Sequence, residues 1–99
     1  TRRIIMLLCS NPLFSLGQTV ATPNALDLLA QHNTSCFSLL ARHQSGDWGN
    51  VPVEDALSNQ QAIERGYRIM SVYQLETGKV WIITEADRSV TTMLLPEEY

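Results

Sequence analysis

The sequence predicts an α+β domain in which about three helices precede and cover a three-stranded antiparallel sheet. Apolar residues recur at helical spacing between residues 22 and 65, which favours helices in that part of the chain. From Gly66 onward the side chains alternate as in strands, and two turn-rich stretches divide this last third. With 99 residues, 44% of them hydrophobic, the chain is long enough for one domain with a single core.

Residues 1–13 stand apart from the predicted domain, which we place at residues 14–99. Two arginines followed by six apolar residues resemble the start of a signal peptide. The apolar run is shorter than the usual ~7–15 residues of such peptides, and no A-x-A site follows it. It is also far below the ~20 residues of a membrane span. We interpret residues 1–13 as a leader, as an N-terminal strand, or as sequence upstream of a true start at Met6.

The first helix is predicted to follow a short strand, which loose alternation suggests within residues 14–20. Thr22 can cap this helix, and Pro23 fits its first position, where a missing N–H costs nothing. His32-Asn33 is expected to end it. Its apolar stripe consists of Ala25, Leu26, Leu29 and Ala30.

Two further helices are expected, one from Thr34 or Ser35 to about Gln44 and one between Pro52 and Gly66. The third helix has acidic residues in its first turn and an arginine in its last, which suits the helix dipole. Its apolar side is thin, which places it at the surface. The supporting apolar positions are Phe37, Leu39, Leu40 and Ala41 in the second helix and Val53, Leu57 and Ile63 in the third.

Three strands are predicted at residues 67–75, 79–85 and 89–95, and Pro96 ends the last of them. In the first turn, we expect Gly78 to supply a positive φ. The middle strand carries apolar residues on both faces, so it is expected at the centre of a sheet that is at least partly covered on both sides.

We expect the three helices to pack on one face of this meander, with an N-terminal strand as an extension of the sheet. Three strands covered by helices can be independently stable. The residues predicted to form the core are Trp81, Ile83, Ile69, Leu29, Phe37 and Leu40.

Composition and motif content argue against several classes of function. Seven Lys and Arg against ten Asp and Glu give a net charge of −3, which disfavours a nucleic-acid-binding surface. Cys9 and Cys36 fit no metal spacing and make a weak case for a disulfide, so we interpret them as reduced thiols of a cytoplasmic protein. Nucleotide-binding, serine-hydrolase and zinc-protease motifs do not occur. We predict no cofactor and no metal site.

The first candidate site is the segment Arg42-His-Gln-Ser-Gly-Asp-Trp-Gly49, which follows the second helix. His43 can donate or accept a proton near neutral pH. Asp47 can orient this imidazole or bind a cation, and Arg42 and Trp48 complete a binding loop. The structural alternative is that Asp47 caps a turn and Trp48 covers the edge of the core.

The second candidate site is the polar turn between the last two strands. Glu85 can act as a base or ligand there, and the planar guanidinium of Arg88 suits a carboxylate or phosphate. Ser89 and Thr91 add hydroxyl groups. The structural alternative is a salt-bridged turn, in which Asp87 accepts from the backbone and pairs with Arg88.

Three motifs in order resemble a family of small, plasmid-related bacterial proteins. They are Leu16-Gly-Gln-Thr-Val-Ala-Thr-Pro23, the Arg42–Gly49 segment, and Trp81-Ile-Ile-Thr-Glu-Ala-Asp-Arg-Ser-Val-Thr-Thr92 with Leu94-Leu-Pro96. The resemblance covers roughly residues 14–99. It implies a bacterial, cytoplasmic setting on a plasmid or another mobile element, and it implies no catalytic residue.

The leading functional hypothesis is a non-enzymatic accessory protein that binds a protein or nucleic-acid partner through the two candidate sites. It rests on two compact polar clusters without a complete catalytic set. The alternative is a small hydrolase that acts on RNA or a nucleotide, with His43 and Glu85 as acid and base in one cleft. A homodimer that pairs through an exposed sheet edge or face is a third hypothesis. We predict no membrane partner.

Overall fold

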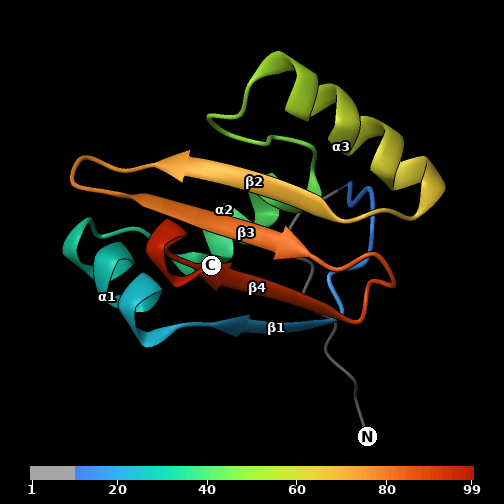
Figure 1. Ribbon diagram of the computed structural model, residues 1–99. Coiled ribbons are helices and arrows are strands. Elements are labelled where there is room, and N and C mark those ends of the chain that lie inside the picture. The colour runs from blue at the N-terminus through green and yellow to red at the C-terminus, as the bar shows by residue number, and fades with distance from the viewer. Residues whose placement is uncertain (1–10) are drawn as a thin grey trace, which may run out of the picture.

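The computed structural model describes residues 11–99, so the predictions for residues 1–10, including Cys9 and the apolar run, lie outside the described part. The described elements are β1 Gln18–Ala21, α1 Pro23–Gln31, α2 Cys36–Gln44, α3 Val53–Arg65, β2 Ile69–Gln74, β3 Lys79–Thr84, β4 Val90–Leu94 and the 3₁₀ turn η1 Pro96–Glu98 (Figure 1). The predicted α+β class is therefore confirmed. Within residues 11–99, no helix is long and apolar enough to cross a lipid bilayer.

The sheet has four strands in the order β1-β4-β3-β2, and it is mixed rather than wholly antiparallel. β2, β3 and β4 form the predicted meander, with Val72 opposite Trp81 and Trp81 opposite Leu94. β1 adds a fourth strand that runs parallel to β4, with Thr19 opposite Thr91. The sequence predicts an extra strand but not its direction, because the partner of this strand lies at the other end of the chain.

Helices α1 and α2 supply the main core on one face of the sheet, and Figure 1 shows α2 behind the strands. α3 lies instead beside the outer edge of β2 (Figure 1), where Ala62 packs in a second cluster with Trp48 and Ile69. The prediction that all three helices cover one face is therefore wrong for α3. The main core consists of Leu16, Ala25, Leu29, Leu39, Leu40, Tyr73, Val80, Ile82 and Met93.

The helix ends follow the local signals in the sequence. The hydroxyl of Thr22 accepts from the Ala25 N–H, and Pro23 occupies the first position of α1. The hydroxyl of Ser35 caps α2. Gly66 ends α3 in the left-handed conformation, with φ 73°. These predictions are confirmed because a cap depends on residues only a few positions away.

The two hairpin turns differ from the prediction in where the chain takes a positive φ. Gly78 does not have one; a Cβ at this position would lie 3.1 Å from Leu28 Cδ2, so α1 leaves little room for a side chain there. The positive φ occurs at Arg88, with φ 61°, in the turn between β3 and β4. The guanidinium of Arg88 donates to four backbone carbonyls, which holds the residue in this unusual conformation.

The predicted core is confirmed at Ile69, Ile83, Leu29 and Leu40, which are all buried. Trp81 is only half-buried. Phe37 is 59% exposed, so its assignment to the core is wrong. The reason lies in α2, whose buried positions are Leu39, Leu40 and His43. Because the histidine belongs to the inward stripe, the helix is rotated and Phe37 points outward.

The outer edge of β2 is closed by groups from two other segments. The side-chain amide of Asn59 donates to the Met70 carbonyl and accepts from the Met70 N–H. The Val72 N–H donates to the Trp48 carbonyl, and the Val72 carbonyl accepts from the Asn50 N–H. The Asn50 side chain accepts a further N–H at the end of the strand. These contacts occupy the backbone groups that a neighbouring strand would need.

Candidate functional site

His43 lies in the interior, where helix α2 faces the centre of the sheet. It is 0% exposed. Its Nδ1 atom bonds the hydroxyl of Ser71 on β2, and its Nε2 atom lies 3.0 Å from the hydroxyl of Thr84 on β3. The Thr84 hydroxyl lies 2.7 Å from that of Thr91 on β4, which donates to the Leu16 carbonyl. One chain of hydrogen bonds therefore crosses three strands inside the protein.

The number of available hydrogens determines which group donates and which accepts in each of these hydrogen bonds. A carbonyl can only accept, so Thr91 gives its single hydroxyl hydrogen to Leu16. Thr84 must then donate to Thr91, which leaves the Thr84 oxygen to accept from His43 Nε2–H. Nδ1 of His43 in turn accepts from Ser71. The imidazole is therefore the neutral Nε2–H tautomer, and each of its nitrogens has the partner that this tautomer requires.

The surroundings of His43 favour the uncharged ring. Phe14 and Trp48 contact it edge-on, with ring centroids 5.2 and 5.9 Å away. Burial lowers the pKa of His43 to about 3, because the charged form loses its hydration. His43 therefore stays uncharged near neutral pH and does not titrate there, although titration near pH 7 is the property that made it a candidate in the sequence.

The rest of the first candidate segment forms a braced loop. Arg42 Nε lies 2.6 Å from a carboxylate oxygen of Asp47, and the guanidinium carbon of Arg42 lies 4.6 Å from the centre of the Tyr73 ring. The hydrogen bond from Arg42 lowers the pKa of Asp47. The Tyr73 hydroxyl donates to the Asp47 carbonyl, and Trp48 is buried against the core. Arg42 and Asp47 are thus partners of each other and of the loop.

The carboxylates of the second candidate site are also engaged within the protein. Glu85 accepts from Arg68 at 3.1 Å, in an ion pair on the surface. Asp87 accepts from the hydroxyl and the N–H of Ser89, and the hydroxyl bond lowers the pKa of Asp87. Asp87 does not pair with Arg88, because the guanidinium of Arg88 donates to backbone carbonyls instead.

Arg88 ties several segments together. Its guanidinium donates to the carbonyls of Ala62 at the end of α3 and of Tyr67 just before β2, as well as to two carbonyls of its own turn. The guanidinium carbon also lies 5.7 Å from the centre of the Phe14 ring. The donors with which Arg88 was expected to clamp an anion are therefore used inside the protein.

The two candidate sites meet in the interior rather than in a shared cleft. They are joined through Thr84, the residue before Glu85, which bonds both His43 of the first site and Thr91 of the second. Because side chains alternate along a strand, Glu85 points away from Thr84 and reaches Arg68 at the surface. A buried, fully bonded imidazole and a surface carboxylate give no support to the proposed acid–base pair. Thr91 belongs to the buried chain as well.

Sequence reasoning missed the polar and aromatic group on the sheet face opposite α1 and α2. The Trp81 and Tyr99 rings lie 5.5 Å apart, and Arg68 donates to the Tyr99 hydroxyl at 2.7 Å. Met70 and Thr92 share this face, since Met70 lies opposite Ile83 and Ile83 opposite Thr92. We call Arg68, Met70, Trp81, Thr92 and Tyr99 the open face. The available signal was the second apolar side of β3, where Trp81 and Ile83 alternate with the core-facing Val80 and Ile82.

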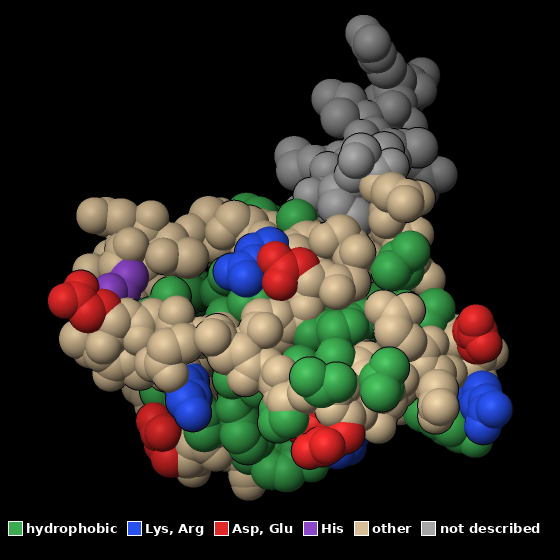
Figure 2. Space-filling view, turned by 90° about the horizontal axis from the view of Figure 1, so that it is seen from above, with side chains coloured by type: hydrophobic (Ala, Val, Ile, Leu, Met, Phe, Trp, Pro, Cys, Tyr) green, Lys and Arg blue, Asp and Glu red, His purple; other side chains and the backbone are tan. Residues whose placement is uncertain are grey.

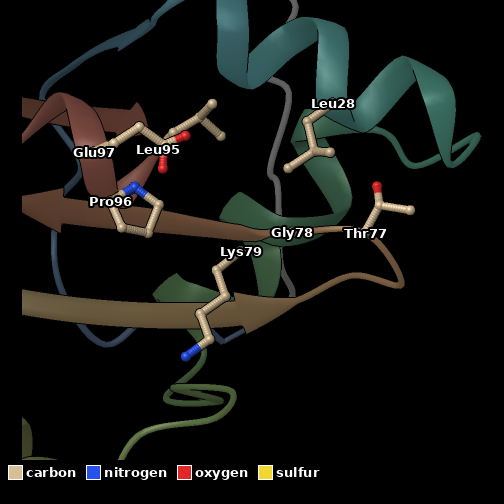
Figure 3. A pocket seen from close by; sticks show the side chains of 7 residues that line it. All are labelled: Leu28, Thr77, Gly78, Lys79, Leu95, Pro96 and Glu97. Carbon is tan, nitrogen blue, oxygen red and sulfur yellow. The ribbon is translucent and has the colours of Figure 1, made fainter.

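A hollow of about 320 Å³ lies between α1, the β2–β3 turn and η1 (Figure 3). Its lining contains one lysine and one glutamate, and Figure 3 shows the Lys79 side chain extending away from the other residues. None of the sequence-predicted site residues lines it. Among the described residues, no group of three or more His, Cys, Asp or Glu side chains is placed to hold a metal ion.

The geometry thus assigns stabilising contacts to most of the predicted site residues and leaves the open face as a separate surface feature. Cys36, a free thiol that is partly buried, lies apart from both candidate sites, on α2. Comparison of the chain with protein-family models, with curated proteins and with solved structures gave no match.

Proposed function

We propose that this chain is a non-enzymatic accessory module that binds another protein through the open face. The observation that carries the proposal is the grouping of Trp81, Tyr99 and Arg68 on the sheet face that α1 and α2 do not cover. Among the described elements, the 3₁₀ turn η1 lies over this face in Figure 1. Trp, Tyr, Met and Arg are the side chains enriched at the centres of protein–protein interfaces.

Charge favours a protein over a nucleic acid as the partner. The one arginine of the open face is paired with Glu85, at 3.1 Å. Seen from above in Figure 2, the described part of the molecule shows charged groups of both signs in small sets, without a continuous basic patch. The net charge of −3 points the same way. A bacterial mobile element and the cytoplasm remain the proposed setting, which rests on the resemblance of the three motifs.

The proposal is tested by placing a photo-crosslinking amino acid at Thr92 of the open face and, as the matched control, at Ser38 on the exposed side of α2. Crosslinking in cells that express the protein, followed by mass spectrometry, identifies adducts. We expect a defined protein adduct from position 92 that position 38 does not give. Trp81→Ala should reduce that adduct at least tenfold, since truncation of an interface hot spot costs about 2 kcal/mol.

Two results would contradict the proposal. One is an adduct pattern that is the same from both positions, or absent from position 92. The other is an adduct that Trp81→Ala leaves unchanged while circular dichroism shows the variant folded. An RNA adduct at position 92 would replace the protein partner with a nucleic-acid one.

A further inference from the structure

The two edges of the sheet differ in whether other segments bond their outward backbone N–H and C=O groups. The outer edge of β2 is occupied by the Asn59 amide and by the backbone at Trp48 and Asn50. β1, at the opposite edge, is exposed along most of its length. Its four residues Gln18–Ala21 include no proline, no lysine and no other charged side chain, the devices with which proteins usually block an edge strand.

The ladder between β1 and β4 determines which backbone groups of β1 face outward. Gln18 N–H donates to the Ser89 carbonyl, and Thr22 N–H donates to the Met93 carbonyl. In a parallel ladder alternate residues bond the same neighbour. Gln18 and Val20 therefore bond β4, whereas the N–H and C=O of Thr19 and Ala21 point away from the sheet. Within residues 11–99, no hydrogen bond occupies these four groups.

An apolar groove runs beside this edge on the helical side of the sheet. It has a volume of about 170 Å³ and lies between β1 and α2. Phe37, at its rim, is 59% exposed, and Val20 is 43% exposed. No charged residue lines the groove; its lining consists of Thr19, Val20, Ala21, Cys36, Phe37, Leu40 and Met93.

We propose that a second copy of this chain occupies the edge, with its β1 antiparallel to the first. Gly17, with φ 64°, and Pro23 bound the strand, so little of the chain outside residues 18–21 can join the pairing. Centring the two-fold axis on Val20 places Thr19 of each copy opposite Ala21 of the other. All four outward groups of each strand then find partners, as in a hydrogen-bonded antiparallel pair.

Side chains and charge fit the same arrangement. Val20 of each copy meets its equivalent across the axis, and the groove of each copy, with its Phe37 ring, lies beside the joined strands. Each copy carries a net charge of −3, and the uncharged segment 18–21 lets two copies approach without opposing like charges directly. The strand is short, so we expect a weak, concentration-dependent dimer. This inference does not depend on the proposed function.

The test exploits the position of Val20 on the axis. Sedimentation velocity over roughly 5–500 µM, a range suited to a small interface, measures the dimer of the unaltered chain. Val20→Lys and Val20→Glu each place like charges opposite one another and should each be monomeric throughout the range. An equimolar mixture of the two variants should recover a dimer, because opposite charges then face each other across the axis.

Two further measurements distinguish this interface from non-specific association. Leu57→Glu alters an apolar residue that is 60% exposed on α3 and should dimerise as the unaltered chain does. Amide hydrogen exchange at Thr19 and Ala21 should slow as concentration rises, while Gln18 and Val20 are protected at every concentration. A monomer throughout the range, or a dimer that both Val20 variants retain, would overturn the proposal. A mixture that stays monomeric beside a dimeric unaltered chain would overturn it too.

Discussion

The imidazole of His43 shows how one residue can decide the arrangement of a small core. It bonds Ser71 and Thr84, which lie on two different strands, and through Thr84 it reaches Thr91 on a third. None of these polar side-chain atoms is left without a partner. The sequence nominates His43 as a site residue because a histidine near Asp47 and Trp48 is typical of loops with acid–base chemistry. The hydroxyls that make it structural lie 28 to 48 positions away, so no local pattern could reveal them.

His43 should make the stability of the protein depend on pH. Its pKa in the folded protein is lowered to about 3 from 6.5, so the unfolded chain binds the extra proton first. Stability is therefore fully present above pH 6.5 and falls as pH drops toward 3. We expect the free energy of unfolding in urea to fall by about 2 kcal/mol between pH 6.5 and pH 5, where carboxylates still remain largely ionised.

The non-titrating variant His43→Gln is the control for this slope. Whatever its own stability, its unfolding free energy should change little over the same interval. A slope that is equal in both proteins would show that His43 is not the group that titrates.

At the scale of the elements, the predictions succeed where the signal is local and fail where it is not. Thr22, Ser35 and Gly66 mark helix ends through contacts with their near neighbours. The rotation of α2 is different, because it depends on which strand faces the helix. Phe37 is the more hydrophobic residue, yet His43 turns inward because the sheet offers it two hydroxyls.

Asn59 offers a direct test of how the β2 edge is closed. Asn59→Ala removes both hydrogen bonds to Met70, so the backbone N–H and C=O of Met70 lose these partners. We expect the free energy of unfolding to fall by about 1–3 kcal/mol, the cost of unsatisfied buried groups. Faster amide exchange at Met70 should accompany the loss.

Ser58, the exposed neighbour of Asn59 on α3, supplies the comparison. Ser58→Ala should stay within about 0.5 kcal/mol of the unaltered chain. If Asn59→Ala were equally mild, and Met70 exchange unchanged, the amide would have no part in closing the edge.

At the scale of the whole molecule, the motifs singled out in the sequence act mainly as connectors. His43 joins α2 to β2 and β3, and Arg88 joins the β3–β4 turn to the end of α3 and the start of β2. The class of the fold and the meander were predictable because periodicity and turns record them along the chain. The parallel pairing of β1 with β4 and the place of α3 were not, since both depend on contacts between distant segments.

Arg88 is expected to be sensitive even to a conservative change. Arg88→Lys keeps the charge but loses the fork that donates to several carbonyls at once. We expect both Arg88→Lys and Arg88→Ala to lower the free energy of unfolding by about 2 kcal/mol, measured by urea denaturation. Arg65, exposed in the last turn of α3, provides the matched control, and Arg65→Ala should change stability by less than about 0.5 kcal/mol. Full stability in Arg88→Lys would show that charge alone suffices.

The closed edge of β2 has a consequence for how many copies can assemble. A sheet with two available edges can add strands at both ends, and each added copy offers a fresh edge, which is the geometry of a fibre. Here the Asn59 amide and the Asn50 segment occupy one end of every copy. Pairing through β1 uses the other end, so the joined sheet would finish at β2 on both sides. In the proposed dimer, growth would therefore stop at two copies, and Asn59 would limit assembly as well as bond Met70.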